Sequence, residues 1–62
     1  CEEDGELILV DYKTDLIRSS RILLDHYQKQ LDYYARALTQ LTRKNVREKW
    51  IYSMTMQKAI QC

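Results

Sequence analysis

The sequence of 62 residues contains no proline, no phenylalanine and a single glycine. It also lacks a long hydrophobic run, since no apolar stretch approaches the roughly 20 residues that span a bilayer. No charged segment followed by an apolar one opens the chain, so the pattern of a secretory signal is missing as well. These absences argue against membrane insertion and secretion, and we expect a cytoplasmic protein without membrane contact.

The two cysteines stand at the two ends, Cys1 and Cys62, and two are too few for the disulfide frameworks of small secreted domains. Free thiols in a cytosolic chain are one interpretation. A disulfide between the two ends is the alternative, and the sequence leaves it open because it does not show whether the ends meet. Neither cysteine has a second Cys or a His at ligand spacing, so we expect no zinc or iron-sulfur site.

The composition that remains is typical of a globular domain, with 45% hydrophobic and 31% charged residues. The formal net charge of +1 hides an asymmetry along the chain. Residues 1–15 carry six carboxylates against Lys13 alone, whereas residues 16–62 carry nine lysines and arginines against three carboxylates. This pattern is compatible with a cation site beside a polyanion-binding surface, and equally with ordinary solvated faces.

The first structural signal is the pair Asp4-Gly5, which predicts a two-residue β-hairpin turn because both central positions need positive φ. Only three residues precede this turn, so we expect a hairpin whose first strand is cut short. The apolar run from Leu7 to Val10 predicts a central strand covered on both faces. The sequence therefore indicates a piece of a larger sheet.

A long helix is predicted from Ser20 onward, because apolar residues recur at spacings of three and four. Ser19 or Ser20 can cap its start, and the segment of Arg43, Lys44 and Asn45 marks its end. The predicted apolar stripe consists of Leu24, Tyr27, Leu31, Tyr34, Leu38 and Leu41. This helix should cover one face of the sheet and leave the other without a cover from this chain.

After the helix the sequence returns to period two from Arg47 to Thr55, which predicts a second strand, and a short last strand is indicated at Ala59-Ile60. Strand, long helix and strand form a βαβ unit with parallel strands. We therefore expect an α/β (α+β) fold in one domain or part of one, with a missing segment or an oligomer covering the open face.

Asp11 and Lys13 are two residues apart on the predicted strand, so their side chains share one face at its carboxyl end. A carboxylate there can hold a divalent cation, and a nearby ammonium can orient water or stabilise phosphate charge. Gln30 and Tyr34 share a helix face and can hydrogen-bond near that strand end. Taken separately, each pair also fits a simple surface ion pair or an ordinary amphipathic helix.

Taken together, these segments resemble a known family. The stretch Asp4 to Asp15, followed by Tyr27 to Leu38, is similar to the RecB-type branch of the PD-(D/E)XK nuclease superfamily, and most of all to the C-terminal nuclease domain of AddA subunits of bacterial helicase-nucleases. The segment from Glu48 to Ser53 is similar to that domain's last strand. The resemblance implies that residues 1–62 are a C-terminal fragment of such a domain, with a truncated restriction-endonuclease-like core.

The resemblance also implies roles for individual residues. Asp11 matches the metal-binding acid, Tyr12 would lend its backbone carbonyl to the same ion, and Lys13 matches the catalytic lysine. Gln30 and Tyr34 match the Gln-x-x-x-Tyr motif that shapes the active site and contacts DNA. Candidate phosphate contacts are Arg36, Arg43, Lys44, Arg47 and Lys49.

The implied function is Mg²⁺- or Mn²⁺-dependent exonuclease cleavage of DNA. It would belong to an ATP-dependent helicase-nuclease that pairs with an AddB-like partner and acts in double-strand break processing and recombinational repair. No iron-sulfur cluster is implied. The family's other metal-binding Asp lies upstream of Cys1, so the isolated chain should bind metal weakly, be inactive and form homo-oligomers. The alternative is a small non-catalytic interaction module that self-associates through its long amphipathic helix.

Overall fold

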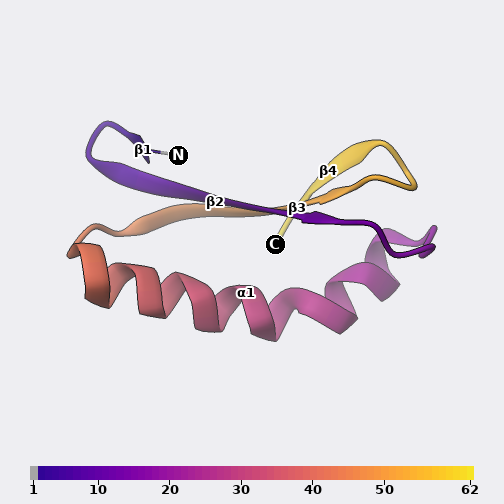
Figure 1. The fold of residues 1–62 in the computed structure, drawn as a ribbon, viewed down its shortest axis with the longest axis horizontal. Coiled ribbons are helices and arrows are strands. Elements are labelled where there is room, and N and C mark those ends of the chain that lie inside the picture. The colour runs from indigo at the N-terminus through magenta and orange to yellow at the C-terminus, as the bar shows by residue number, and fades with distance from the viewer. Residues whose placement is uncertain (1) are drawn as a thin grey trace.

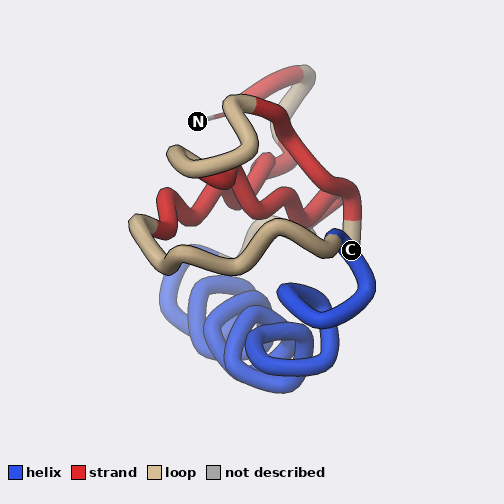
Figure 2. The backbone as a smooth tube through the Cα atoms, turned by 90° about the vertical axis from the view of Figure 1, so that its right-hand side faces the viewer, coloured by secondary structure: helices blue, strands red, loops and turns tan. Residues whose placement is uncertain are grey.

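The computed structural model describes residues 2–62, which form a four-stranded mixed sheet with one long helix along one of its faces (Figures 1 and 2). The elements are β1 (Glu2–Glu3), β2 (Glu6–Lys13), α1 (Ser20–Thr42), β3 (Val46–Ser53) and β4 (Lys58–Gln61). The strands lie side by side in the order β1-β2-β3-β4. This α+β arrangement confirms the fold class inferred from the sequence. Cys1, and with it a pairing to Cys62, lies outside the described residues.

The hairpin predicted from Asp4-Gly5 is present. Both residues have positive φ, 53° at Asp4 and 79° at Gly5, as a type I′ turn requires. The turn joins β1 antiparallel to β2, with Glu2 opposite Leu7 and Glu3 opposite Glu6. The described part of β1 therefore accompanies β2 only at its beginning.

The ends of α1 follow from local chemistry. The Ser19 hydroxyl accepts a hydrogen bond from the backbone N–H of Ile22 at 3.4 Å, which satisfies one of the free donors of the first turn. At the other end, Arg43 adopts the left-handed conformation and its backbone N–H donates to the Thr39 carbonyl at 2.8 Å. Both predicted ends are confirmed. Among the described residues, no helix has the length and apolar character needed to cross a membrane.

Strands β2 and β3 are parallel and α1 connects them, so the predicted βαβ unit is confirmed (Figure 1). The register places Asp11 opposite Ile51 and Lys13 opposite Ser53. Strand β3 ends at Ser53, not at Thr55 as predicted, because a turn over residues 54–57 follows it. The turn leads into β4, which pairs antiparallel with β3 where the sequence indicated a last strand.

The core lies between α1 and the sheet, and its buried apolar side chains are Leu23, Leu31, Ile51 and Ile60. The predicted apolar stripe is wrong at two positions, because Tyr34 is 43% exposed and Leu41 is 82% exposed. Leu23, which the stripe omitted, is buried. The cluster that holds Leu23 is also covered by Ile17 and Met56, from the segments that follow β2 and β3. Helical spacing alone does not reveal that loops extend the core at one end of the helix.

The sheet face opposite α1 is open (Figure 2). Val10 is 39% and Tyr12 is 68% exposed there, and the Tyr12 ring meets the Tyr52 ring edge-on at a centroid distance of 5.8 Å. Among the described residues β2 is therefore covered on one face only, and its cover on both faces stays a prediction for a larger assembly. The accompanying expectation, that this chain covers only one face, agrees with the structure.

Replacing Leu31 by alanine should destabilise the protein by about 2 to 5 kcal/mol, because Leu31 is fully buried and truncation leaves a cavity. A chain of this length has a total stability of roughly 3 to 9 kcal/mol, so the substitution should remove a large share of it. Urea titration followed by circular dichroism measures the change. The matched control is Leu41→Ala, which should shift stability by less than about 0.5 kcal/mol; equal effects of the two changes would contradict this position of the core.

Candidate active site

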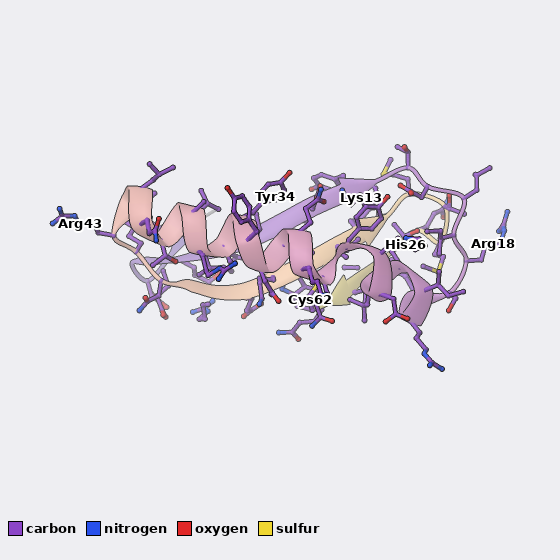
Figure 3. All side chains as sticks on the ribbon, turned by 90° about the horizontal axis from the view of Figure 1, so that it is seen from below. Lys13, Arg18, His26, Tyr34, Arg43 and Cys62 are labelled. Carbon is purple, nitrogen blue, oxygen red and sulfur yellow. The ribbon has the colours of Figure 1, made fainter. Side chains whose placement is uncertain are left out.

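The Lys13 ammonium lies at the carboxyl end of β2, where that strand meets the middle of α1 (Figure 3). Its Nζ is 3.1 Å from Asp11 Oδ2 and donates a hydrogen bond to Gln30 Oε1 at 3.0 Å. It also lies 4.1 Å from the centroid of the Tyr27 ring. The structure thus brings together three of the residues that the sequence singled out, Asp11, Lys13 and Gln30.

Strand and helix periodicity explain this meeting. Asp11 and Lys13 alternate with Tyr12, so both side chains point to the sheet face that α1 covers. Leu31 is fully buried against the sheet, which fixes the rotation of α1 about its axis. Its neighbour Gln30 is thereby directed to the flank of the helix beside β2. The Lys13 side chain is only 17% exposed, so its charge is partly shielded from solvent.

Asp15 and Tyr27 belong to the same cluster, although sequence reasoning assigned neither a separate role. The Tyr27 hydroxyl donates to Asp15 Oδ2 at 2.5 Å, and the Thr55 hydroxyl donates to the Asp15 backbone carbonyl at 2.7 Å. The hydrogen bond to Asp15, followed by desolvation and the charges of Asp15 and Asp11, raises the pKa of the Tyr27 phenol. Both residues lie inside the motifs that carry the family resemblance, and this position is the sequence signal that could have identified them as site residues.

The other predicted site residues are less closely engaged. Tyr34 lies one turn beyond Gln30 and is partly exposed, with its ring beside that of Tyr33 (Figure 3). The Lys13 carbonyl accepts from the Met54 N–H at 2.9 Å, so it points toward β3. Because successive carbonyls in a strand point to opposite edges, the Tyr12 carbonyl is directed to the other edge of β2.

Three of the five candidate phosphate contacts are ion paired. The pairs join Lys44 to Glu2, Arg47 to Glu3 at 2.8 Å and to Glu48 at 3.6 Å, and Lys49 to Asp32 at 2.5 Å. The hydrogen bond from Arg47 to Glu3 raises the pKa of the guanidinium above its usual range. These cations therefore connect β1, β3 and α1 within the chain.

Arg36 and Arg43 make no ion pair with the described residues, and both are exposed on or beside α1. Arg43 lies at the far end of the helix from Lys13 (Figure 3). Thirteen residues separate it from Gln30, which corresponds to about 20 Å of helix. A ligand that contacts both Lys13 and Arg43 must therefore be extended.

The oxygen atoms at this site are of the type that a hard divalent cation prefers. Carboxylate and carbonyl oxygens, as offered by Asp11 and Tyr12, are the ligands that Mg²⁺ takes in proteins. In residues 2–62, however, no three side chains of His, Cys, Asp or Glu come close enough to form a metal cluster. Asp11 and Tyr12 would supply part of a ligand set and would need further donors to complete it.

Fold and site together define an α+β unit that presents an acid and a lysine at the carboxyl end of a central strand. The chain is 44% identical over 61 residues to the AddA subunit of the ATP-dependent helicase/nuclease from Clostridioides difficile, covering 95% of this chain. It is 50% identical over 62 residues to the corresponding protein from Lachnoclostridium phytofermentans, and 44% identical over 62 residues to that of Clostridium beijerinckii. This chain is therefore homologous to a segment of the AddA family of ATP-dependent helicase/nucleases, and the resemblance to its RecB-type nuclease region is confirmed.

The match covers nearly all of this chain but only 5%, 4% and 5% of the length of these three relatives. No family model matches the sequence. No solved structure matches it either.

The raised pKa of Tyr27 gives a prediction about pH. Its hydrogen bond to Asp15 should stabilise the fold fully below the unperturbed tyrosine pKa of about 10, and this contribution should disappear as pH rises through the higher pKa of the folded state. Asp15→Ala should move the Tyr27 pKa down toward its ordinary value. An NMR titration that follows the Tyr27 ring carbons measures the shift. Asp25→Ala, which removes an exposed acid from α1, is the control; an unchanged Tyr27 pKa in Asp15→Ala would show that the hydrogen bond does not cause the shift.

Proposed function

We propose that this chain is part of the DNA nuclease domain of a helicase/nuclease, and that Asp11 and Lys13 take part in phosphodiester hydrolysis. The observation that carries the proposal is the position of Lys13 Nζ, 3.1 Å from Asp11 Oδ2 and 3.0 Å from Gln30 Oε1. Two relatives at 44 and 50% identity are named as helicase/nuclease subunits. The reaction, the DNA substrate and the partner protein are proposals for the full-length protein.

Phosphodiester hydrolysis needs a positioned water and positive charge beside the phosphate oxygens. Asp11 and the Tyr12 carbonyl would hold Mg²⁺ or Mn²⁺, which supplies an activated water and neutralises phosphate charge when bound. Lys13 would donate a hydrogen bond to a phosphate oxygen or to the attacking water. Gln30 holds the ammonium in place through its carbonyl oxygen, and Tyr34 lies one turn farther along the path a DNA strand would take.

The missing part of the ligand set can be located from the strand register. Glu2 is opposite Leu7 in the antiparallel pair, so each step forward along β2 is matched by one step back along β1. If this pairing continues, the third residue before Cys1 lies directly opposite Asp11. An aspartate there would complete the carboxylate pair that the family resemblance implies. Without it, the isolated 62-residue chain should bind metal weakly and be inactive.

A groove beside β2 supports such a continuation. Its volume is about 430 Å³, and Leu7, Leu9, Val10, Leu38 and Thr42 are among the residues that line it. Its lining residues come from β2 and from the C-terminal part of α1. The upstream continuation of β1 is the occupant we propose, because it would extend a hairpin already present and would cover these apolar side chains.

The five cations remain candidates for DNA phosphates. Arg36 and Arg43 are available without breaking an ion pair among the described residues. Lys44, Arg47 and Lys49 would exchange carboxylate partners for phosphates, and exposed ion pairs contribute only about 0 to 1 kcal/mol each, so the exchange costs little. A strand of DNA running along α1 from Lys13 toward Arg43 would meet several of them.

Self-association through the helix finds no support in the fold. Leu31, in the middle of the predicted apolar stripe, is fully buried against the sheet and is not available to a second helix. Self-association of the isolated chain would instead use the open sheet face, where Val10 and Tyr12 are exposed. In the full-length protein, other parts of the chain would cover that face.

The proposal is tested in the full-length protein with its partner. Asp11→Ala and Lys13→Ala should each abolish Mg²⁺-dependent DNA degradation, by at least about 10²-fold, while ATP hydrolysis continues. Degradation of a labelled linear duplex and release of phosphate from ATP measure the two activities. Asp25→Ala and Lys58→Ala are matched controls, since both residues are exposed and neither makes an ion pair among the described residues. Normal degradation by Lys13→Ala would refute the assigned role.

A further inference from the structure

We propose that Tyr27 and Asp15 act as a positioning pair for Lys13, in which the Tyr27 ring holds the ammonium and Asp15 holds the ring. This inference needs no bound metal, and its catalytic consequence rests on the proposed nuclease function. The pair is defined by two contacts, from Lys13 Nζ to the ring centroid at 4.1 Å and from the Tyr27 hydroxyl to Asp15 Oδ2 at 2.5 Å.

The Lys13 ammonium is held on three sides. A lysine ammonium has three N–H bonds and no acceptor. Lys13 meets Asp11 on one side, Gln30 on a second and the π face of Tyr27 on a third. Two of these partners are oxygen acceptors, and the third is an aromatic face, which attracts the cation without taking a hydrogen bond, so one N–H remains for the phosphate oxygen or water of the proposed reaction. The three contacts together fix the end of a side chain that is otherwise flexible.

The Tyr27 ring itself is held at both ends. Its Cβ belongs to α1, and Tyr27 packs against the core cluster. Its hydroxyl is bound by Asp15, whose backbone carbonyl is in turn bound by the Thr55 hydroxyl at 2.7 Å. Asp15 comes two residues after Lys13, in the segment that leads from β2 into α1. The position of the ring, and with it that of the ammonium, therefore depends on how the segment after β2 is placed relative to α1.

Asp15 also affects the charge distribution of the Tyr27 ring. A carboxylate that accepts the phenol hydrogen bond pushes electron density into the ring, which makes the ring face a better partner for an ammonium. The pKa of Tyr27 is raised, so the hydroxyl keeps its proton at neutral pH and remains a donor. Asp15 thus acts on Lys13 through the ring and makes no direct ion pair with it.

Three substitutions separate positioning from mere support of the fold. Tyr27→Leu removes the ring, Tyr27→Phe keeps the ring and removes its hydroxyl, and Asp15→Ala removes the acceptor. In the full-length protein, Tyr27→Leu should lower kcat for DNA degradation about tenfold and leave KM for DNA and ATP hydrolysis unchanged, because only the orientation of Lys13 is lost. Tyr27→Phe should recover most of this loss.

Tyr27→Phe and Asp15→Ala should each lower kcat by about two- to threefold, and the double variant should lose no more than either one, because both remove the same hydrogen bond. Tyr33→Leu, which replaces a tyrosine of α1 that is 62% exposed, is the matched control and should keep full kcat. If Tyr27→Leu behaves like Tyr33→Leu, or if Tyr27→Phe is as damaging as Tyr27→Leu, the positioning role is refuted.

A second measurement on the 62-residue chain does not depend on nuclease activity. Protons above an aromatic ring are shielded, so the Lys13 ε-methylene NMR signals should lie upfield in the original chain and in Tyr27→Phe, and should lose this shift in Tyr27→Leu. A failure of the proposed nuclease function would be seen in a different experiment, as normal DNA degradation by the Lys13→Ala protein. An unshielded Lys13 signal in the original chain would refute the contact itself.

Discussion

The packing of α1 onto β2 and β3 is the constraint on which the rest of the structure depends. Leu31 and Ile51 are both fully buried at this junction and are the centre of a small core. Their contact fixes how far α1 is rotated and where along the sheet it lies. A helix rotated by one residue would place Leu31 where Gln30 now meets Lys13. The geometry of the candidate site is thus a consequence of core packing, and few buried residues support it.

Much of this arrangement could be predicted from local patterns. Asp4-Gly5 predicted the turn, Ser19 the start of α1, and the two-residue spacing of Asp11 and Lys13 their common face. These features depend on neighbours in sequence, and their physical causes are visible in a single stretch of chain. Predicting the contact between Lys13 and Gln30 required the fold class as well, because 17 residues separate them.

The features that escaped prediction depend on contacts between distant segments. Leu23 is buried because loops after β2 and β3 cover that end of α1, which helical spacing does not reveal. The role of Asp15 depends on a hydrogen bond to Tyr27 across 12 residues. The charge asymmetry was visible in the sequence, yet its outcome was not: carboxylates of β1 neutralise Lys44 and Arg47 far from the site, so cation number does not measure the charge available to DNA.

The division of charges along β2 bears on how such a site can be completed. Four of the six acids of the N-terminal segment fall into two groups, with Glu2 and Glu3 engaged by cations at one end and Asp11 and Asp15 near Lys13 at the other. Near Lys13, one carboxylate faces the ammonium and the other faces a phenol, so the two negative charges have separate partners. A further carboxylate brought opposite Asp11 would meet a like charge, and a divalent cation between them would relieve that repulsion. The same geometry would make metal binding and the docking of the upstream strand mutually favourable, because each reduces the electrostatic cost of the other.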